Sequence, residues 1–272
     1  MKNYSLYSMQ NAKEFYGVKK IRRIGQSYEF EQIKEYVLGD DLRNVNWKAT
    51  ARTGELKVNH FEEEKSQQVY TIIDKSRTMN MPFDGMSLLD YAINASLVIS
   101  NVALQKQDKA GLITFSDKIG NTVKAQNDPG HISKIIQMLY KEKEREVEAN
   151  YELLYQLSNR LIHGRSLLFL FTNVESMYSL ERILPILRKL NQRHILIVIF
   201  FKNSDLETYA HSDAKNTEEI YLKTIAEKMS VEKEKLSLSL NTYGIQTIFT
   251  DPENLTLNTV NKYLELKARG MI

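Results

Sequence analysis

Several short segments of this 272-residue chain are apolar at nearly every position, and longer segments with helical spacing lie between them. A strand that alternates apolar and polar residues has one face in water, whereas a strand that is apolar throughout is covered on both faces. Such strands, alternating with helices, predict a parallel sheet between two layers of helix. The predicted strands are residues 69–73, 110–115, 167–171, 195–200 and 245–249.

The intervening segments place apolar residues three or four positions apart, which is the spacing of one helix face. The predicted helices are residues 89–104, 132–140, 151–161, 180–190, 218–229 and 255–267. We therefore expect an α/β fold over residues 67–272, a doubly wound and mostly parallel sheet with helices on both faces. Residues 1–66 are polar and irregular and hold the only tryptophan, so we expect a small amino-terminal subdomain packed on the main domain.

The composition excludes several classes of partner and site. The chain has 37 Lys and Arg against 34 Asp and Glu, and its net charge of +3 is too small to indicate nucleic-acid binding. It has no cysteine, which excludes disulfides and thiolate metal sites and is compatible with the cytoplasm. No apolar run approaches the ~20 residues that a membrane-spanning helix needs, so we expect no membrane segment in this chain.

A polar loop follows the first predicted strand and carries oxygen ligands at alternate positions, Asp74, Ser76 and Thr78. In a doubly wound fold the ligand crevice lies at the carboxyl ends of the strands, so we expect this loop at its mouth. Carboxylate and hydroxyl oxygens are suited to Mg²⁺. The other interpretation is that these side chains cap the next helix and satisfy the loop backbone. The pattern leaves both open.

This loop resembles the D-x-S-x-S motif of von Willebrand factor A domains, here Asp74-x-Ser76-x-Thr78. The resemblance implies two further metal ligands from later loops, which it would place at Asn150 and Asn173. Each of these is an amide and brings no negative charge, and two basic residues lie within the motif. We therefore expect a degenerate metal-ion-dependent adhesion site with weak or absent Mg²⁺ binding.

The amino-terminal segment carries a dense motif, Tyr36-x-x-Gly39-Asp40-Asp41-x-Arg43-x-x-Asn46-Trp47-Lys48-x-Thr50-Ala51-Arg52. Its spacing resembles the signature of the bacterial "domain of unknown function 58" family, and the likeness continues to the end of the chain. The resemblance implies an A-domain-like fold and a role as adaptor or co-chaperone with a MoxR-type AAA+ ATPase and its client. Many members carry two membrane helices ahead of the signature. The protein is therefore expected in the cytoplasm, or at the inner face of the membrane if a longer form is anchored there.

Four residues are candidates for contacts with a partner protein. Arg43 and Arg52 either present a partner-binding or anion-binding patch or join an internal charge network. Trp47, between them, is expected to anchor the subdomain to the sheet. Met79 and Met81 either adapt to a partner near the crevice or pack locally.

A catalytic alternative starts from the loop at Asp74. Its pattern is similar to the D-x-D-x-T loop of aspartate-nucleophile, Mg²⁺-dependent phosphatases and phosphotransferases, but Ser76 stands where the general acid would be. None of the five histidines has metal-ligand spacing, and His194 is expected to be a surface residue. The charged run at residues 141–148 is expected to be solvated. The sequence thus favours a non-catalytic protein-interaction module whose crevice lies in the loops that follow the strands.

Overall fold

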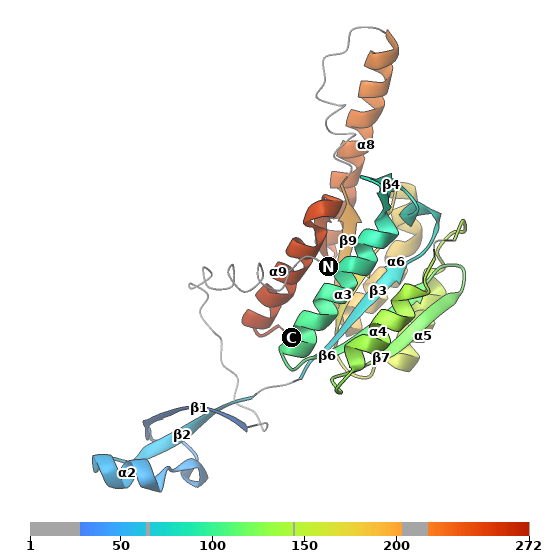
Figure 1. Ribbon diagram of the computed structural model, residues 1–272. Helices are drawn as coiled ribbons and strands as arrows, with labels where there is room; N and C mark the ends of the chain where they lie inside the picture. Colours follow the sequence, from blue (N-terminus) through green and yellow to red (C-terminus); the bar gives the residue numbers. More distant parts are fainter. Residues whose placement is uncertain (1–27, 64–65, 144, 203–216, 272) are drawn as a thin grey trace.

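A six-stranded sheet forms the centre of the protein, in the order β10-β9-β8-β3-β6-β7. The computed structural model describes residues 28–63, 66–143, 145–202 and 217–271 (Figure 1). Five strands run parallel, and β7 pairs antiparallel with β6 at one edge. Their bounds are β3 (Gln68–Asp74), β6 (Lys109–Phe115), β7 (Ile119–Gln126), β8 (Leu167–Phe171), β9 (Ile195–Phe201) and β10 (Gln246–Thr250). The predicted parallel strands are confirmed, and each end lies within one residue of its predicted position.

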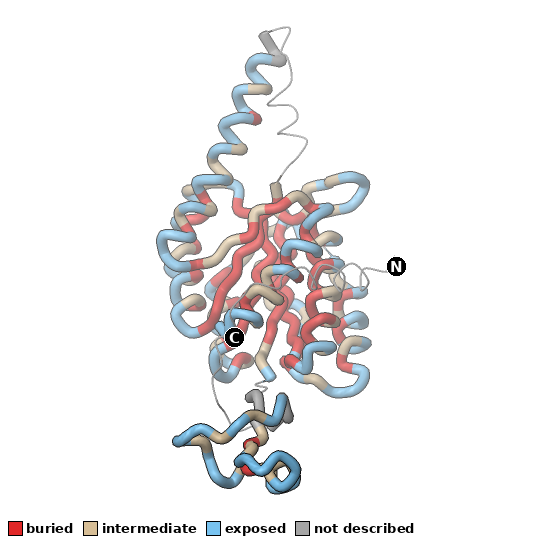
Figure 2. Tube along the Cα trace, turned by 90° about the vertical axis from the view of Figure 1, so that its left-hand side faces the viewer, coloured by how far each residue is buried: buried red, intermediate tan, exposed pale blue. Residues whose placement is uncertain are grey.

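Helices cover both faces of this sheet, which confirms the doubly wound α/β fold. Side chains of α3 (Leu88–Gln105), α4 (His131–Tyr140) and α9 (Leu255–Ala268) share one buried apolar cluster with the strands. A second cluster joins the other face to α5 (Tyr151–Leu161), α6 (Met177–Arg193) and α8 (Thr217–Thr242). The buried residues gather between these two layers (Figure 2).

The order of the strands places a switch point beside β3. From β3 the chain passes through α3 to β6 on one side, then returns to β8 on the other side and continues outward to β9 and β10. The connections therefore diverge between β3 and β8. In sheets of this kind the crevice outside the carboxyl ends of the two diverging strands is where ligands bind. Here those ends are Asp74 and Phe171.

The helix α8 is longer than predicted, because the pattern indicated a helix ending near residue 229 and the helix ends at Thr242. Its second half packs on the sheet through Leu236 and Leu240, which are both buried. Its first half extends past the ends of the strands (Figure 1). Within the described ranges, no helix combines the length and the apolar character that crossing a bilayer requires.

The amino-terminal segment forms its own two-stranded antiparallel sheet from β1 (Tyr28–Glu35) and β2 (Lys57–Glu63). Between the strands lie the short helices η1 (Leu42–Asn44) and α2 (Trp47–Thr53). The division of the chain at residue 66 stays a prediction.

The signature motif supplies the caps and the turn of this segment. Asp41 accepts a hydrogen bond from the Arg43 backbone N–H at 3.0 Å, and the Asn46 side chain caps α2. Gly39 has a φ of 110°, which suits a residue without a side chain. The prediction that Trp47 anchors the subdomain was wrong, because this residue is 72% exposed. It begins α2 at the outer surface of the segment.

Candidate functional site: a strand-end pocket above a buried aspartate

Asp74 ends the central strand β3 and is only 1% exposed. Its Oδ1 accepts a hydrogen bond from the Ser76 backbone N–H at 2.8 Å. Its Oδ2 accepts from the Thr172 hydroxyl at 2.8 Å and from the Tyr151 hydroxyl at 3.4 Å. Burial raises the pKa of Asp74, and these hydrogen bonds oppose the rise. Both oxygens of the buried carboxylate thus accept hydrogen bonds from the chain itself.

The two hydroxyls of the loop lie beside each other, and the Ser76 hydroxyl also interacts with the Asp74 carboxylate. The Ser76 and Thr78 side-chain oxygens lie 3.1 Å apart, and either can donate to the other. Ser76 occupies the cap position of η2 (Arg77–Met79), but its side chain makes no cap hydrogen bond. Asp74 is therefore the residue that satisfies the loop backbone, which supports the capping interpretation for this one side chain.

The two amides that the resemblance indicated lie in different surroundings. Asn150 is exposed, and its Oδ1 caps α5 by accepting from the Leu153 backbone N–H at 3.2 Å. Asn173 is buried, and its Nδ2 donates to the Thr78 carbonyl at 3.1 Å. Its Oδ1 accepts from the Lys233 ammonium at 3.2 Å. Asn173 thus contacts the loop that follows Asp74, whereas Asn150 caps the helix that begins at Tyr151.

The two basic residues of the motif pair with acids of residues 141–148. The Lys75 ammonium forms an ion pair with Glu142, and the two side chains are 10% and 3% exposed. Arg77 lies 3.7 Å from Glu148 at the surface. The expectation that the whole charged run is solvated was wrong for Glu142, which also accepts from the Thr114 hydroxyl.

The oxygen cluster around Asp74 is a poor match to Mg²⁺. The ion needs several free oxygen ligands in an octahedron, with carboxylates to balance its charge. Here both Asp74 oxygens and the Asn173 carbonyl oxygen already accept hydrogen bonds from the protein. The Asn173 oxygen moreover accepts from an ammonium, which repels a divalent cation. Among the residues that the structure describes, no group of three or more His, Asp or Glu side chains is placed to hold a metal.

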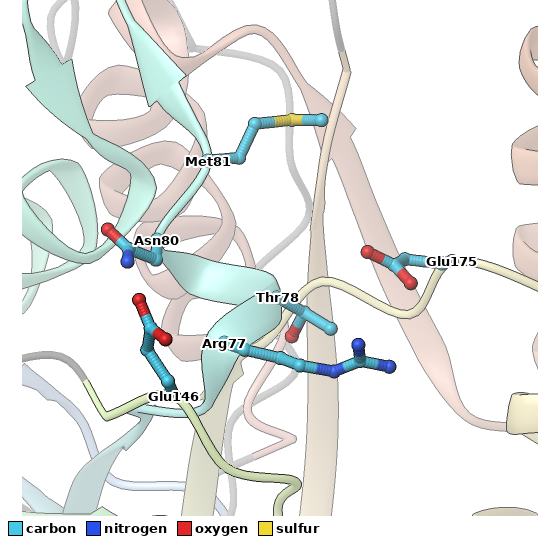
Figure 3. A pocket seen from close by; sticks show the side chains of 6 residues that line it. All are labelled: Arg77, Thr78, Asn80, Met81, Glu146 and Glu175. Carbon is cyan, nitrogen blue, oxygen red and sulfur yellow. The ribbon is translucent and has the colours of Figure 1, made fainter.

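A pocket of about 570 Å³ opens at this edge of the sheet, next to the Asp74 loop. Figure 3 shows its wall, to which the loop after β3, the segment before α5 and the loop after β8 all contribute. The lining side chains are Arg77, Thr78, Asn80, Met81, Glu146 and Glu175. The pocket wall thus presents side chains of both charges, two neutral polar side chains and one flexible apolar side chain.

The predicted partner contacts divide between the pocket and other places. Met81 lines the pocket. Met79 is 0% exposed and packs in the core with α3, so the prediction that it contacts a partner was wrong. Arg43 and Arg52 are exposed on the amino-terminal segment, outside the pocket lining.

Sequence reasoning missed the side chains that bind Asp74 and Asn173. Thr172 follows directly on a fully buried strand, which was a usable sign of a position at the crevice. Tyr151 begins a helix and Lys233 lies within one, and nothing in either pattern indicates a role here. Burial and the nearby Asp74 charge raise the pKa of Tyr151, so its hydroxyl stays a donor.

The fold is similar to that of several solved structures. One is the SpRpn10 VWA domain, with 12% identity and a TM-score of 0.43, covering 71% of this chain and 93% of that one. Another is an aerotolerance-related membrane protein from Bacteroides fragilis NCTC 9343 with multiple mutations to serines, with 15% identity, a TM-score of 0.43 and coverages of 73% and 98%. A third is the conserved hypothetical protein BatB from Bacteroides thetaiotaomicron, with 13% identity, a TM-score of 0.47 and coverages of 73% and 97%.

Comparison with curated proteins found no match. The family profile described as "Protein of unknown function DUF58" matches residues 32–235, a range that includes the signature motif from Tyr36 to Arg52 and the whole strand-end site. This match confirms the resemblance seen in the sequence, and the chain belongs to the DUF58 family.

Proposed function

We propose that this protein is a non-catalytic interaction module that binds another protein at the strand-end pocket. The proposal rests on a difference in accessibility between the side chains of the pocket wall and Asp74, which lies beneath them. The pocket wall presents Arg77, Met81 and Glu175, whereas Asp74 is buried with both oxygens hydrogen-bonded. A side chain of a partner can meet the wall, but it cannot reach the carboxylate without disrupting the loop.

The chemistry of the wall suits a protein ligand. Met81 is unbranched and adapts its shape to different apolar groups. Arg77 and the two glutamates, Glu146 and Glu175, allow charged hydrogen bonds with a partner that presents both signs of charge. A pocket of about 570 Å³ holds a few side chains, so a stable complex would also bury the surrounding rim.

We further propose that the partner is a MoxR-type AAA+ ATPase, which this protein serves as adaptor or co-chaperone. This part of the proposal rests on the family resemblance of the signature motif. The pocket supports only the more general role in protein binding.

The phosphatase alternative is disfavoured by the state of Asp74. A carboxylate nucleophile needs an oxygen that faces the substrate, and here Asp74 is 1% exposed with both oxygens hydrogen-bonded to the chain. We expect no release of phosphate from an aryl phosphate in excess Mg²⁺. Turnover that disappears in Asp74→Asn would instead establish an enzyme.

The proposal is tested by capture of the partner from the native host. The tagged chain should retain an AAA+ ATPase, identified by mass spectrometry, and the purified ATPase should bind the purified chain directly. Arg77→Glu and Glu175→Arg should each weaken this binding about tenfold or more, as removal of a central contact does. Lys134→Glu, on the exposed face of α4, is the matched control and should bind normally. If no ATPase binds, the proposed partner is wrong. If one binds equally to all variants, the pocket is not the binding site.

A further inference from the structure

The side chain of Asn173 uses both of its ends to join separate parts of the strand-end site. Its amide nitrogen donates to the Thr78 carbonyl at 3.1 Å, and its amide oxygen accepts from the Lys233 ammonium at 3.2 Å. An aspartate in this position could not do both, because an ionised carboxylate has no hydrogen to donate to a carbonyl. The loop after β3, the loop after β8 and the helix α8 are therefore connected through one residue that is 3% exposed.

Lys233 is held firmly in this position. Its ammonium also donates to the Phe201 carbonyl at the end of β9, at 2.7 Å. The preceding residue, Glu232, accepts from the Met177 backbone N–H at the start of α6, at 3.2 Å. Two consecutive residues of α8 thus fasten this helix to the ends of two strands and to the start of a neighbouring helix.

The ammonium brings a positive charge to the place where the resemblance implies a metal ligand. The Lys233 ammonium and a Mg²⁺ ion would compete for the side-chain oxygen of Asn173, and the two cations repel each other at close range. The remaining oxygens of the cluster also take part in hydrogen bonds within the chain. Asp74 accepts from the Ser76 backbone N–H and from Thr172 and Tyr151, and the Ser76 hydroxyl interacts with both Thr78 and Asp74. The described contacts thus connect Asp74 and Asn173 to donors and acceptors of the chain itself.

We propose that Lys233 supplies the cation of this site and that Asn173 and Lys233 together close the strand ends without a metal. In this arrangement the Lys233 ammonium provides the positive charge that a bound metal ion would provide. It also connects α8 to the edge of the pocket through its hydrogen bond to Asn173. The inference stands apart from the proposed partner, because it is tested by metal binding and stability alone.

Four proteins test the proposal by thermal unfolding in EDTA and in excess Mg²⁺. The wild type should unfold at the same Tm in both. Lys233→Met should lower Tm by about 3–10 °C in both buffers, since it removes charged hydrogen bonds. Lys235→Met, an exposed position two residues along α8, is the matched control and should leave Tm nearly unchanged.

The fourth protein combines Asn173→Asp with Lys233→Met, which adds a carboxylate and removes the ammonium. It should gain a saturable rise of Tm with Mg²⁺ and should bind Mn²⁺ about tenfold or more tightly than the wild type does. The proposal is overturned if the wild type itself shows a saturable Mg²⁺-dependent rise, or if Lys233→Met has no effect on Tm. A folded double variant that gains no metal affinity would contradict it equally. If the double variant does not fold, the wild-type titration and Lys233→Met decide.

Discussion

The Lys75 ammonium and the Glu142 carboxylate form a buried ion pair beside the pocket, joining the loop after β3 to the segment that precedes α5. Backbone hydrogen bonds run alongside this pair, from Arg145 to the Lys75 carbonyl at 2.9 Å and from Arg77 to the Val147 carbonyl at 3.0 Å. Together they hold two walls of the pocket in a fixed relation. The ion pair is therefore expected to matter for stability and for the shape of the site.

Lys75→Met should lower the free energy of unfolding by about 3–5 kcal/mol, because it leaves the Glu142 carboxylate buried without its partner. In a Glu142→Gln background the same substitution should have a much smaller effect, since no buried charge is then abandoned. Urea unfolding of the two single variants and the double variant measures this coupling. Additive effects would mean that the two groups do not interact in solution.

Asp74→Asn should change how stability depends on pH. Burial raises the pKa of Asp74, so the folded state binds a proton more tightly than the unfolded state does. Stability of the wild type must then fall as pH rises from the ordinary Asp value through the raised folded value. The asparagine variant has no such titration, so its stability relative to the wild type should increase over that window and then level off. Urea unfolding in EDTA between pH 3.5 and about 8 tests this. A pH-independent difference would contradict it.

His194 should produce a slope of the opposite sign. It is 4% exposed, which corrects the expectation of a surface position, and burial and the nearby Arg193 lower its pKa. The unfolded state therefore binds the proton more tightly, and stability should be lost as pH falls below about 6.5 towards the lowered folded value. His194→Gln should remove this loss, which parallel unfolding curves of variant and wild type can detect. A wild-type slope that survives the substitution would assign it to another group.

Gly111→Ala should destabilise the sheet by about 1–3 kcal/mol, as overpacking does. A methyl group at this position would overlap the Tyr70 ring, whose hydroxyl accepts from the Ala125 backbone N–H at 3.1 Å. The same substitution made together with Tyr70→Leu should be milder, because a shorter side chain no longer covers the glycine. Thermal unfolding compares the two backgrounds, and an equal loss in both would exclude the ring as the cause.

The parallel sheet could be predicted because strands buried on both faces, such as β8 and β9, are apolar at every position. The edge strand β7 was missed, since its exposed residues interrupt any apolar run and Gly120 weakens a strand pattern. The early end predicted for α8 has a similar cause. Beyond residue 229 the charged run at residues 232–235 and several serines interrupt the helical spacing, and only Leu236 and Leu240 are buried there.

The site could be predicted only in part. Asp74, Ser76 and Thr78 were found because they follow a buried strand directly. Their partners were not, since Thr172 lies 98 residues away from Asp74 in the sequence. Whether a loop side chain is buried depends on such distant residues, and no local sequence pattern indicates which ones they are. The burial of Glu142 within a charged run is another case.

The most direct test of the account is hydrogen exchange of the chain with and without the captured AAA+ ATPase. We expect protection of backbone amides at residues 75–81 and 173–176, the loops that border the pocket, with little change on the far edge strand β7. Protection confined to other surfaces, or none while the complex persists, would contradict the claim that the strand-end pocket is the binding site.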